Sequence, residues 1–148
     1  MFMNIKIGRN KLAAAFLVLM LAVLFCVSYG VSAEEKIANA AEKSDRLAFL
    51  QGFGHTCEGK SEEVKEITIP SEFSQVYINY NELQKLMGYN LENYKGQQAT
   101  LYTYAVTNYV GGEEVYAHLL VKDGCVIGGD IASLRIDGFM EGFGGERV

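Results

Sequence analysis

The side chains best suited to chemistry gather in one stretch, VKDGCVIGGDI, at residues 121–131. It holds Cys125 as a candidate nucleophile, Asp130 as a candidate acid–base group, and three glycines that could cradle a phosphate. The glycine spacing matches neither the dinucleotide fingerprint nor the P-loop, so we expect no nucleotide cofactor. Asp123-Gly124 between two apolar runs instead indicates a hairpin turn. Gly128-Gly129 would then mark a bulge, or a helix lying close on the sheet.

The turn at Asp123-Gly124 also sets the register of the predicted hairpin. Lys122 would face Cys125, and His118 would face Gly129. Cys125 and His118 would therefore lie about 10–14 Å apart along the sheet. Because that separation is too long for direct proton transfer, the pattern argues against a cysteine hydrolase.

Two histidines and two cysteines could in principle bind a metal. His55, Cys57, His118 and Cys125 match no zinc-site spacing, however, so we expect no metal. In an oxidising compartment, Cys57 and Cys125 could instead form a disulfide. Free, partly buried thiols are an equally good alternative for the pair.

Tyrosines supply a candidate binding face. Tyr102 and Tyr104 would share one face of a strand, with Tyr116 opposite on the next strand and Asp130 nearby. Aromatic faces of this kind stack against sugar rings, although strand tyrosines usually serve packing. The remaining acids occur singly in predicted turns, so their spacing indicates no catalytic carboxylate pair and we expect no catalytic residue.

Charge divides the chain sharply. Residues 1–11 carry three basic side chains and no acid, whereas residues 34–148 carry 18 acidic and 10 basic residues, a net charge of −8. A surface this acidic repels nucleic acid and anionic lipid headgroups. We therefore expect no nucleic-acid partner.

The segment between these regions predicts a membrane helix. Residues 12–27 are sixteen apolar residues in succession, and residues 12–33 carry no charge, which is enough to cross a bilayer. Basic residues before the segment and acidic ones after it place the N-terminus inside and export the rest. We expect residues 1–33 to be an uncleaved single-pass anchor in the cell membrane. The alternative is a signal peptide cleaved after Ala33, which would leave a secreted domain.

The exported part begins with a predicted helix over residues 34–51, whose first part, 34–45, reads as a stalk. The remainder, 46–148, is a single domain. A second helix should begin at Glu72, capped by Ser71, and end at Gly88. Its apolar stripe is predicted to contain Phe73, Val76, Tyr77, Tyr80, Leu83 and Met87.

Strands are expected where β-branched and aromatic residues concentrate. The predicted strands cover 64–69, 99–109 and 114–121, with a further one from 125 onward. Short connections favour antiparallel pairing. We therefore predict an α+β fold in which an amphipathic helix packs on a small three- to four-stranded antiparallel sheet.

Several motifs resemble an uncharacterised domain-of-unknown-function family of Firmicute bacteria, usually found behind an N-terminal membrane segment. They are RLAFL at 46–50 with FG at 53–54, IPxxF at 69–73 with YNELQ at 80–84, YTY at 102–104 with NY at 108–109, DGxVIGGD at 123–130 and DGFM at 137–140. The resemblance implies a fold and a location but no activity. The family pattern has no cysteine at positions 57 and 125, which argues against a shared cysteine active site.

Together these observations predict a non-catalytic, membrane-tethered extracytoplasmic domain. It would bind an unidentified protein or envelope ligand and be held to the membrane by residues 12–33. Two alternatives stay open: an extracytoplasmic enzyme with an unrecognised site near Asp130 and Cys125, or an accessory subunit of a membrane complex.

Overall fold

The computed structural model describes residues 38–110, 114–135 and 137–148. The predicted anchor or signal peptide at residues 1–33 lies outside these ranges. Neither helix in the described part of the chain has the length and apolar character needed to cross a bilayer. The described part has an α+β fold, as predicted.

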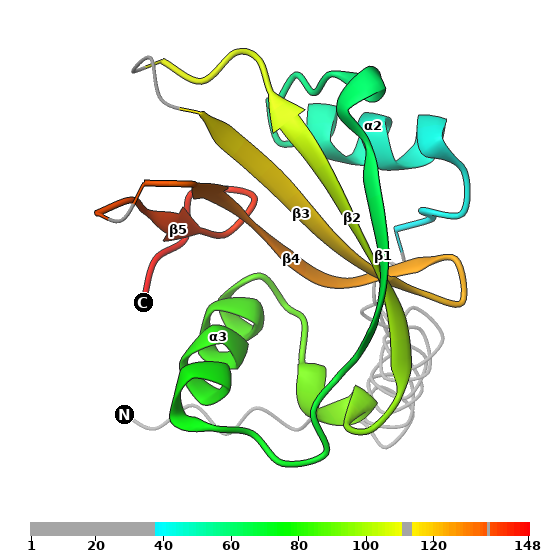
Figure 1. Ribbon diagram of the computed structural model, residues 1–148, viewed down its shortest axis with the longest axis vertical. Helices are drawn as coiled ribbons and strands as arrows, with labels where there is room; N and C mark the ends of the chain where they lie inside the picture. The colour runs from blue at the N-terminus through cyan, green and yellow to red at the C-terminus, as the bar shows by residue number, and fades with distance from the viewer. Residues whose placement is uncertain (1–37, 111–113, 136) are drawn as a thin grey trace, which may run out of the picture. The chain divides into compact units, whose positions relative to one another are not determined.

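Its centre is an antiparallel sheet of five strands in sequence order (Figure 1). The strands are β1 Glu63–Thr68, β2 Gln98–Val106, β3 Val115–Lys122, β4 Cys125–Ser133 and β5 Met140–Glu141. The four predicted strands are confirmed within a few residues. The fifth was missed because two residues are too short to show the alternation of a strand.

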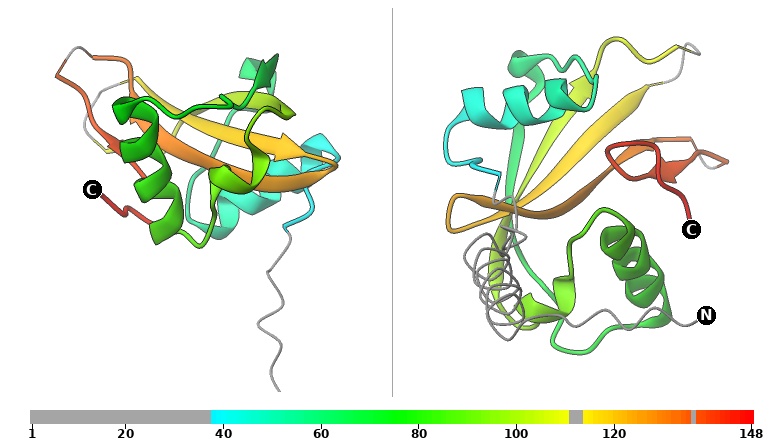
Figure 2. Two further views of the ribbon diagram at one scale, coloured as in Figure 1. Left: turned by 90° about the horizontal axis from the view of Figure 1, so that it is seen from below. Right: turned by 180° about the vertical axis from the view of Figure 1, so that it is seen from behind.

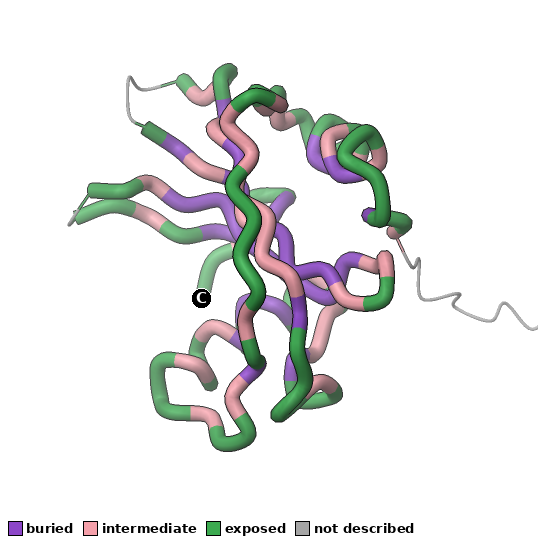
Figure 3. Tube along the Cα trace, turned by 45° about the vertical axis from the view of Figure 1, so that its right-hand side comes forward, coloured by how far each residue is buried: buried purple, intermediate pink, exposed green. Residues whose placement is uncertain are grey.

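One helix lies on each side of the sheet, α2 Lys43–Gly52 and α3 Gln75–Leu86 (Figures 1 and 2). Two 3-10 turns, η1 Gly59–Ser61 and η2 Leu91–Tyr94, complete the described elements. The core on the α2 side includes Leu50, Tyr104 and Ile131. The core on the α3 side includes Leu91 and Leu120. Buried residues concentrate on the middle strands between these two layers (Figure 3).

The predicted stalk requires a correction, because residues 38–42 are not helical. They run beside the β3–β4 hairpin, where the Ala40 N–H donates to the Gly124 carbonyl at 2.7 Å and the Val126 N–H donates to the Ala38 carbonyl at 3.1 Å. Ala40 is fully buried. These main-chain bonds replace helical ones, so α2 begins only at Lys43.

The second helix begins later than predicted, and its apolar stripe is confirmed except at Val76. The other five residues of the stripe are buried or pack against the core: Phe73, Tyr77, Tyr80, Leu83 and Met87. Ser74, not Ser71, is the N-cap, and its hydroxyl accepts a hydrogen bond from the Tyr77 N–H at 3.3 Å. Val76, expected in the apolar stripe, is 78% exposed. The buried face contains Leu83 together with two amides, Asn81 and Gln84.

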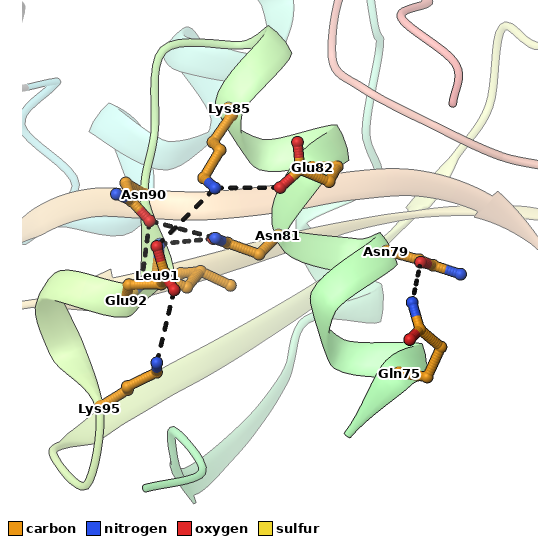
Figure 4. Close-up of polar contacts among 9 residues, drawn as sticks. All are labelled: Gln75, Asn79, Asn81, Glu82, Lys85, Asn90, Leu91, Glu92 and Lys95. Carbon is orange, nitrogen blue, oxygen red and sulfur yellow. Dashed lines mark hydrogen bonds and ion pairs between the residues drawn. The ribbon is translucent and has the colours of Figure 1, made fainter. Parts of the chain in front are cut away.

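Asn81 is buried because its amide holds the connector that follows the helix. Its Oδ1 accepts from the Leu91 N–H at 2.8 Å, and its Nδ2 donates to Asn90 Oδ1 at 3.1 Å (Figure 4). Burying a polar group is tolerated when such bonds are made. The amide therefore fixes η2 against α3, and η2 in turn supplies Leu91 to the core.

The hairpin turn at Asp123-Gly124 forms as predicted, with φ of 51° and 75° at its two residues, as a type I′ turn requires. Lys122 faces Cys125, also as predicted. A bulge then shifts the register, because Ile127 is an extra residue on β4. His118 consequently faces Asp130, and the prediction that it would face Gly129 is wrong by one residue.

The bulged strand depends on a glycine at position 129. Its φ is 153°, and a Cβ there would collide with the His118 carbonyl oxygen and the Phe143 ring. We expect Gly129→Ala to lower the free energy of unfolding by about 2–4 kcal/mol, measured by chemical denaturation.

The matched control is Gly52→Ala at the end of α2, where a Cβ would meet open space. This change should alter stability by less than about 1 kcal/mol. Equal effects of the two substitutions would show that the crowding at Gly129 is not a constraint.

Candidate functional site

Three polar side chains meet on the α3 side of the sheet. His118 on β3 lies directly opposite Asp130 on β4, with 2.8 Å between His118 Nδ1 and Asp130 Oδ1. The Tyr80 hydroxyl reaches down from α3 and donates to Asp130 Oδ2 at 2.9 Å. The Asp130 side chain is 5% exposed, whereas that of His118 is 24% exposed. A buried carboxylate thus orients a histidine that reaches the surface.

Electrostatics favour charge on this histidine. Burial opposes protonation of His118, but the hydrogen bond and the charge of Asp130 outweigh burial and raise its pKa above the ordinary value. Burial and the same carboxylate raise the pKa of Tyr80 well above its ordinary range, so the phenol stays protonated and remains a donor. Asp130 therefore accepts hydrogen bonds on both oxygens.

Gln84 sets the position of α3 over this site. Its Oε1 accepts from the Gly129 N–H at 2.8 Å, and its Nε2 donates to the Gly129 carbonyl at 2.9 Å. The amide thus pairs with the strand backbone beside Asp130. Tyr80 lies one helical turn earlier on the same helix face, which directs its hydroxyl to the carboxylate.

The sequence singled out Asp130, placed Tyr80 in the apolar stripe of the helix and assigned no role to Gln84. His118 was considered as a partner for Cys125 and as one of four possible metal ligands, and the spacing argued against both roles. A usable signal was present in the spacing of Tyr80 and Gln84, which are four apart and so share one helix face, opposite a Gly-Gly pair that admits a close helix. The structure bears out both readings of that pair, since a bulge precedes it and Gln84 touches it.

The predicted tyrosine face is divided between the two sides of the sheet. Tyr104 is buried on the α2 side, where it accepts from Arg46 Nε at 2.8 Å and donates to Glu62. Tyr102 also lies on that side, with the Arg46 guanidinium 3.7 Å from its ring centroid. These two tyrosines therefore attach α2 to the sheet.

Tyr116 lies on the α3 side, because it is two residues from His118 on β3. This side is only partly covered. Beneath α3 and η2, Ala99 and Leu120 are buried, but farther along the same strands four residues remain partly exposed. We call these four residues the open face: Thr103, Ala105, Tyr116 and His118.

The two cysteines do not come together. Cys57 and Cys125 are free thiols in the structure. Cys57 forms a β-bridge with Val106 on β2, whose partner on β3 is Val115. Cys125 faces Lys122 at the other end of β3. Val115 and Lys122 are seven residues apart on one strand, which is about 23 Å. A disulfide needs Cα atoms within about 7 Å, so one chain cannot form this bridge without rearrangement.

The cysteines also offer little chemistry at this site. Burial raises the pKa of Cys57 to about 11, which leaves little thiolate near neutral pH. Cys125 lies at the hairpin turn, five residues before Asp130 on β4. The part of the chain that the structure describes contains no group of three or more His, Cys, Asp or Glu side chains able to hold a metal ion.

Acid should weaken the attachment of α2. Burial raises the pKa of Glu62, but hydrogen bonds from Tyr104, Arg46 and Lys43 outweigh burial and lower it to about 2. Because the folded pKa lies below the unfolded one, this stabilisation is complete above about pH 4.3 and is lost as the pH falls toward 2.

We expect Glu62→Gln to lower the free energy of unfolding by about 2–3 kcal/mol at pH 7. The difference from wild type should shrink between pH 4.5 and 2, measured by denaturation at each pH. Glu72→Gln, at an exposed position, is the control and should change little. A deficit for Glu62→Gln that is the same at every pH would contradict this account.

Asp130 should control the titration of His118. Asp130→Asn keeps the shape of the side chain and removes its charge, so the pKa of His118 should fall, as followed by NMR of the ring protons. Since the folded pKa is raised, the ion pair stabilises fully below about pH 6.5 and loses this effect at higher pH. Asp137→Asn, whose side chain is 77% exposed, is the control. An unchanged His118 titration in Asp130→Asn would show that Asp130 does not control the charge of His118.

Comparison with known proteins gives one match. Residues 49–131 match the family described as Domain of unknown function (DUF4830). Searches among curated proteins and among solved structures found no match. The matched segment extends from α2 into β4 and includes Tyr80, Gln84, His118 and Asp130. Because it covers more than half of the chain, this protein belongs to the DUF4830 family.

Proposed function

We propose that this protein is a non-catalytic binding domain of a Firmicute bacterium, tethered outside the membrane and contacting an envelope ligand or protein through its open face. The main observation behind this proposal is that the buried carboxylate of Asp130 orients the partly exposed ring of His118. Burying a carboxylate is unfavourable unless it is hydrogen-bonded, and here the donors come from two different elements. Such a supported histidine is suited to hold a ligand in one orientation.

The open face also has unused hydrogen-bonding capacity. Nδ1 of His118 is taken by Asp130, and the described part of the chain gives Nε2 no partner. Every buried side-chain nitrogen or oxygen among the described residues does have a partner, so Nε2 must contact solvent. It is therefore free to bond a ligand.

The membrane location rests on the amino-acid sequence. The uncharged residues 12–33 follow a basic stretch and precede the acidic part of the chain. In this proposal they anchor the domain, and the acidic surface faces outward. A secreted domain released after Ala33 would keep the same binding face.

One observation favours a second candidate, general-base catalysis. A histidine oriented by a carboxylate is the base–orienter half of many hydrolytic sites. Within the described residues, however, no hydroxyl or thiol is hydrogen-bonded to His118 Nε2, so a water would have to be the nucleophile. Turnover of an ester substrate that disappears in His118→Gln would favour this candidate over binding alone.

Site-specific cross-linking in cells tests the binding surface. We expect photo-crosslinking p-benzoylphenylalanine at position 103, on the open face, to form adducts, because a bound partner would lie within its reach. The same group in place of Val76, which is 78% exposed on α3, is the matched control. Adducts are read as shifted bands on a blot of the full-length protein. Equal adducts at both positions, or none at 103, would refute the proposed surface.

A further inference from the structure

We infer that the ligand of the open face is a neutral, hydroxyl-rich glycan, with one sugar ring stacked on Tyr116 and hydroxyls bonded to His118. This inference rests on the proposed binding function and specifies its ligand. A sugar ring has an apolar C–H face and a rim of hydroxyls, so it needs an aromatic surface beside polar atoms. The open face supplies both.

Tyr116 provides the aromatic surface. Its register partners are Ala105 on β2 and Ala132 on β4, so two of the smallest side chains flank the ring. Tyr116 belongs to neither core cluster, although the strand that carries it contributes to both. Its hydroxyl has no protein partner among the described residues and must therefore contact solvent. Tyr116 is partly exposed, and in this inference part of the exposed area belongs to the ring.

The polar atoms form the next row of the same face. Thr103 on β2, His118 on β3 and Asp130 on β4 lie side by side in register, two residues from the Tyr116 row. That offset places the polar row about 7 Å from the aromatic one. Thr103 Oγ1, like His118 Nε2, has no protein partner in the described chain and contacts solvent.

The histidine suits a hydroxyl better than an anion. A hydroxyl both donates and accepts, so it can bond Nε2 whether His118 is neutral or protonated. A carboxylate or phosphate could bond only the protonated form. Anionic polymers are further disfavoured by the 18 acidic against 10 basic residues of 34–148. A neutral glycan satisfies both conditions. A cationic peptide also has donors and acceptors for Nε2, but it lacks the apolar C–H ring face that stacks on Tyr116.

Calorimetric titration of the full-length protein, in a detergent without sugar headgroups, tests this assignment. The probes are the neutral hexasaccharides of N-acetylglucosamine and of glucose, an anionic hyaluronan hexasaccharide, and an oligolysine peptide. We expect at least one neutral hexasaccharide to bind and the hyaluronan not to bind. Binding to both neutral sugars assigns recognition to the ring and its hydroxyls, and binding to only the first adds the acetamido group.

Variants locate the sugar. Tyr116→Ala should weaken binding about tenfold or more, and Tyr116→Phe, which keeps the ring, by less than about threefold. His118→Gln should weaken binding about tenfold through the lost hydrogen bond. The matched control is Tyr109→Ala, because Tyr109 stacks on Phe139 and packs against the α2-side core. It should leave the affinity unchanged.

The outcomes separate the inference from the proposed function. No binding of either neutral hexasaccharide, or equal losses in Tyr116→Ala and Tyr109→Ala, would overturn the glycan assignment. Oligolysine binding that depends on Tyr116, without glycan binding, would do the same and point to a cationic peptide. In each case adducts at position 103 would leave the binding surface standing. Absence of those adducts would remove the surface itself.

Discussion

The α3 half of the domain depends on one contact, the pairing of the Gln84 amide with both backbone groups of Gly129. The side-chain amide makes the same kind of hydrogen bonds to Gly129 that the backbone of a neighbouring strand would make. Because Gln84 is fully buried, an unpaired amide there would be strongly destabilising. The contact requires glycine at position 128, where a Cβ would lie 2.7 Å from Gln84 Oε1. Glycine at position 129 is needed for a separate reason, since a side chain there would collide with the neighbouring strand. From this fixed point the helix directs Tyr80 toward Asp130.

The bulge on β4 is the second constraint, and it explains why the strands could be predicted from the sequence but the pairing of His118 could not. Alternation and turn chemistry were enough to predict four strands and the Asp123-Gly124 turn, because both are local signals. The Gly128-Gly129 pair predicted a bulge, but the position of its extra residue, Ile127, is set by packing between strands and helix, which no local pattern reports. One missed residue turned an expected His118–Gly129 pair into a His118–Asp130 pair. Because of that single shift, the sequence did not predict that His118 and Asp130 lie side by side.

Buried polar residues on the two helices show the same limit of prediction from sequence. Charged and amide side chains usually lie at the surface, and no pattern in the sequence marked Arg46 or Gln84 as buried. Both are buried: Arg46 bonds Tyr104, Glu62 and two backbone carbonyls, and Gln84 bonds both backbone groups of Gly129. Tyr102 and Tyr104 were predicted to form a binding face because the sequence does not show that Arg46 packs against both of them. Tertiary hydrogen bonds thus decide which polar residues form the core, and only Tyr116 and Asp130 of the expected set stay on the site's side of the sheet.

Stability alone does not account for the His118–Asp130–Tyr80 arrangement. Removing a carboxylate from water is strongly unfavourable, and hydrogen bonds offset that cost without a large surplus. Apolar residues of similar size usually fold as well or better at such positions. The neighbouring core shows that this sheet has suitable ones, because Leu120 and Ile127 pack under the same layer two or three residues away. The proposed binding function explains this polar cluster by what it presents outward. What it presents is a ring nitrogen of His118 held in a fixed direction on the same face as Tyr116, and the proposed binding function rests on that geometry.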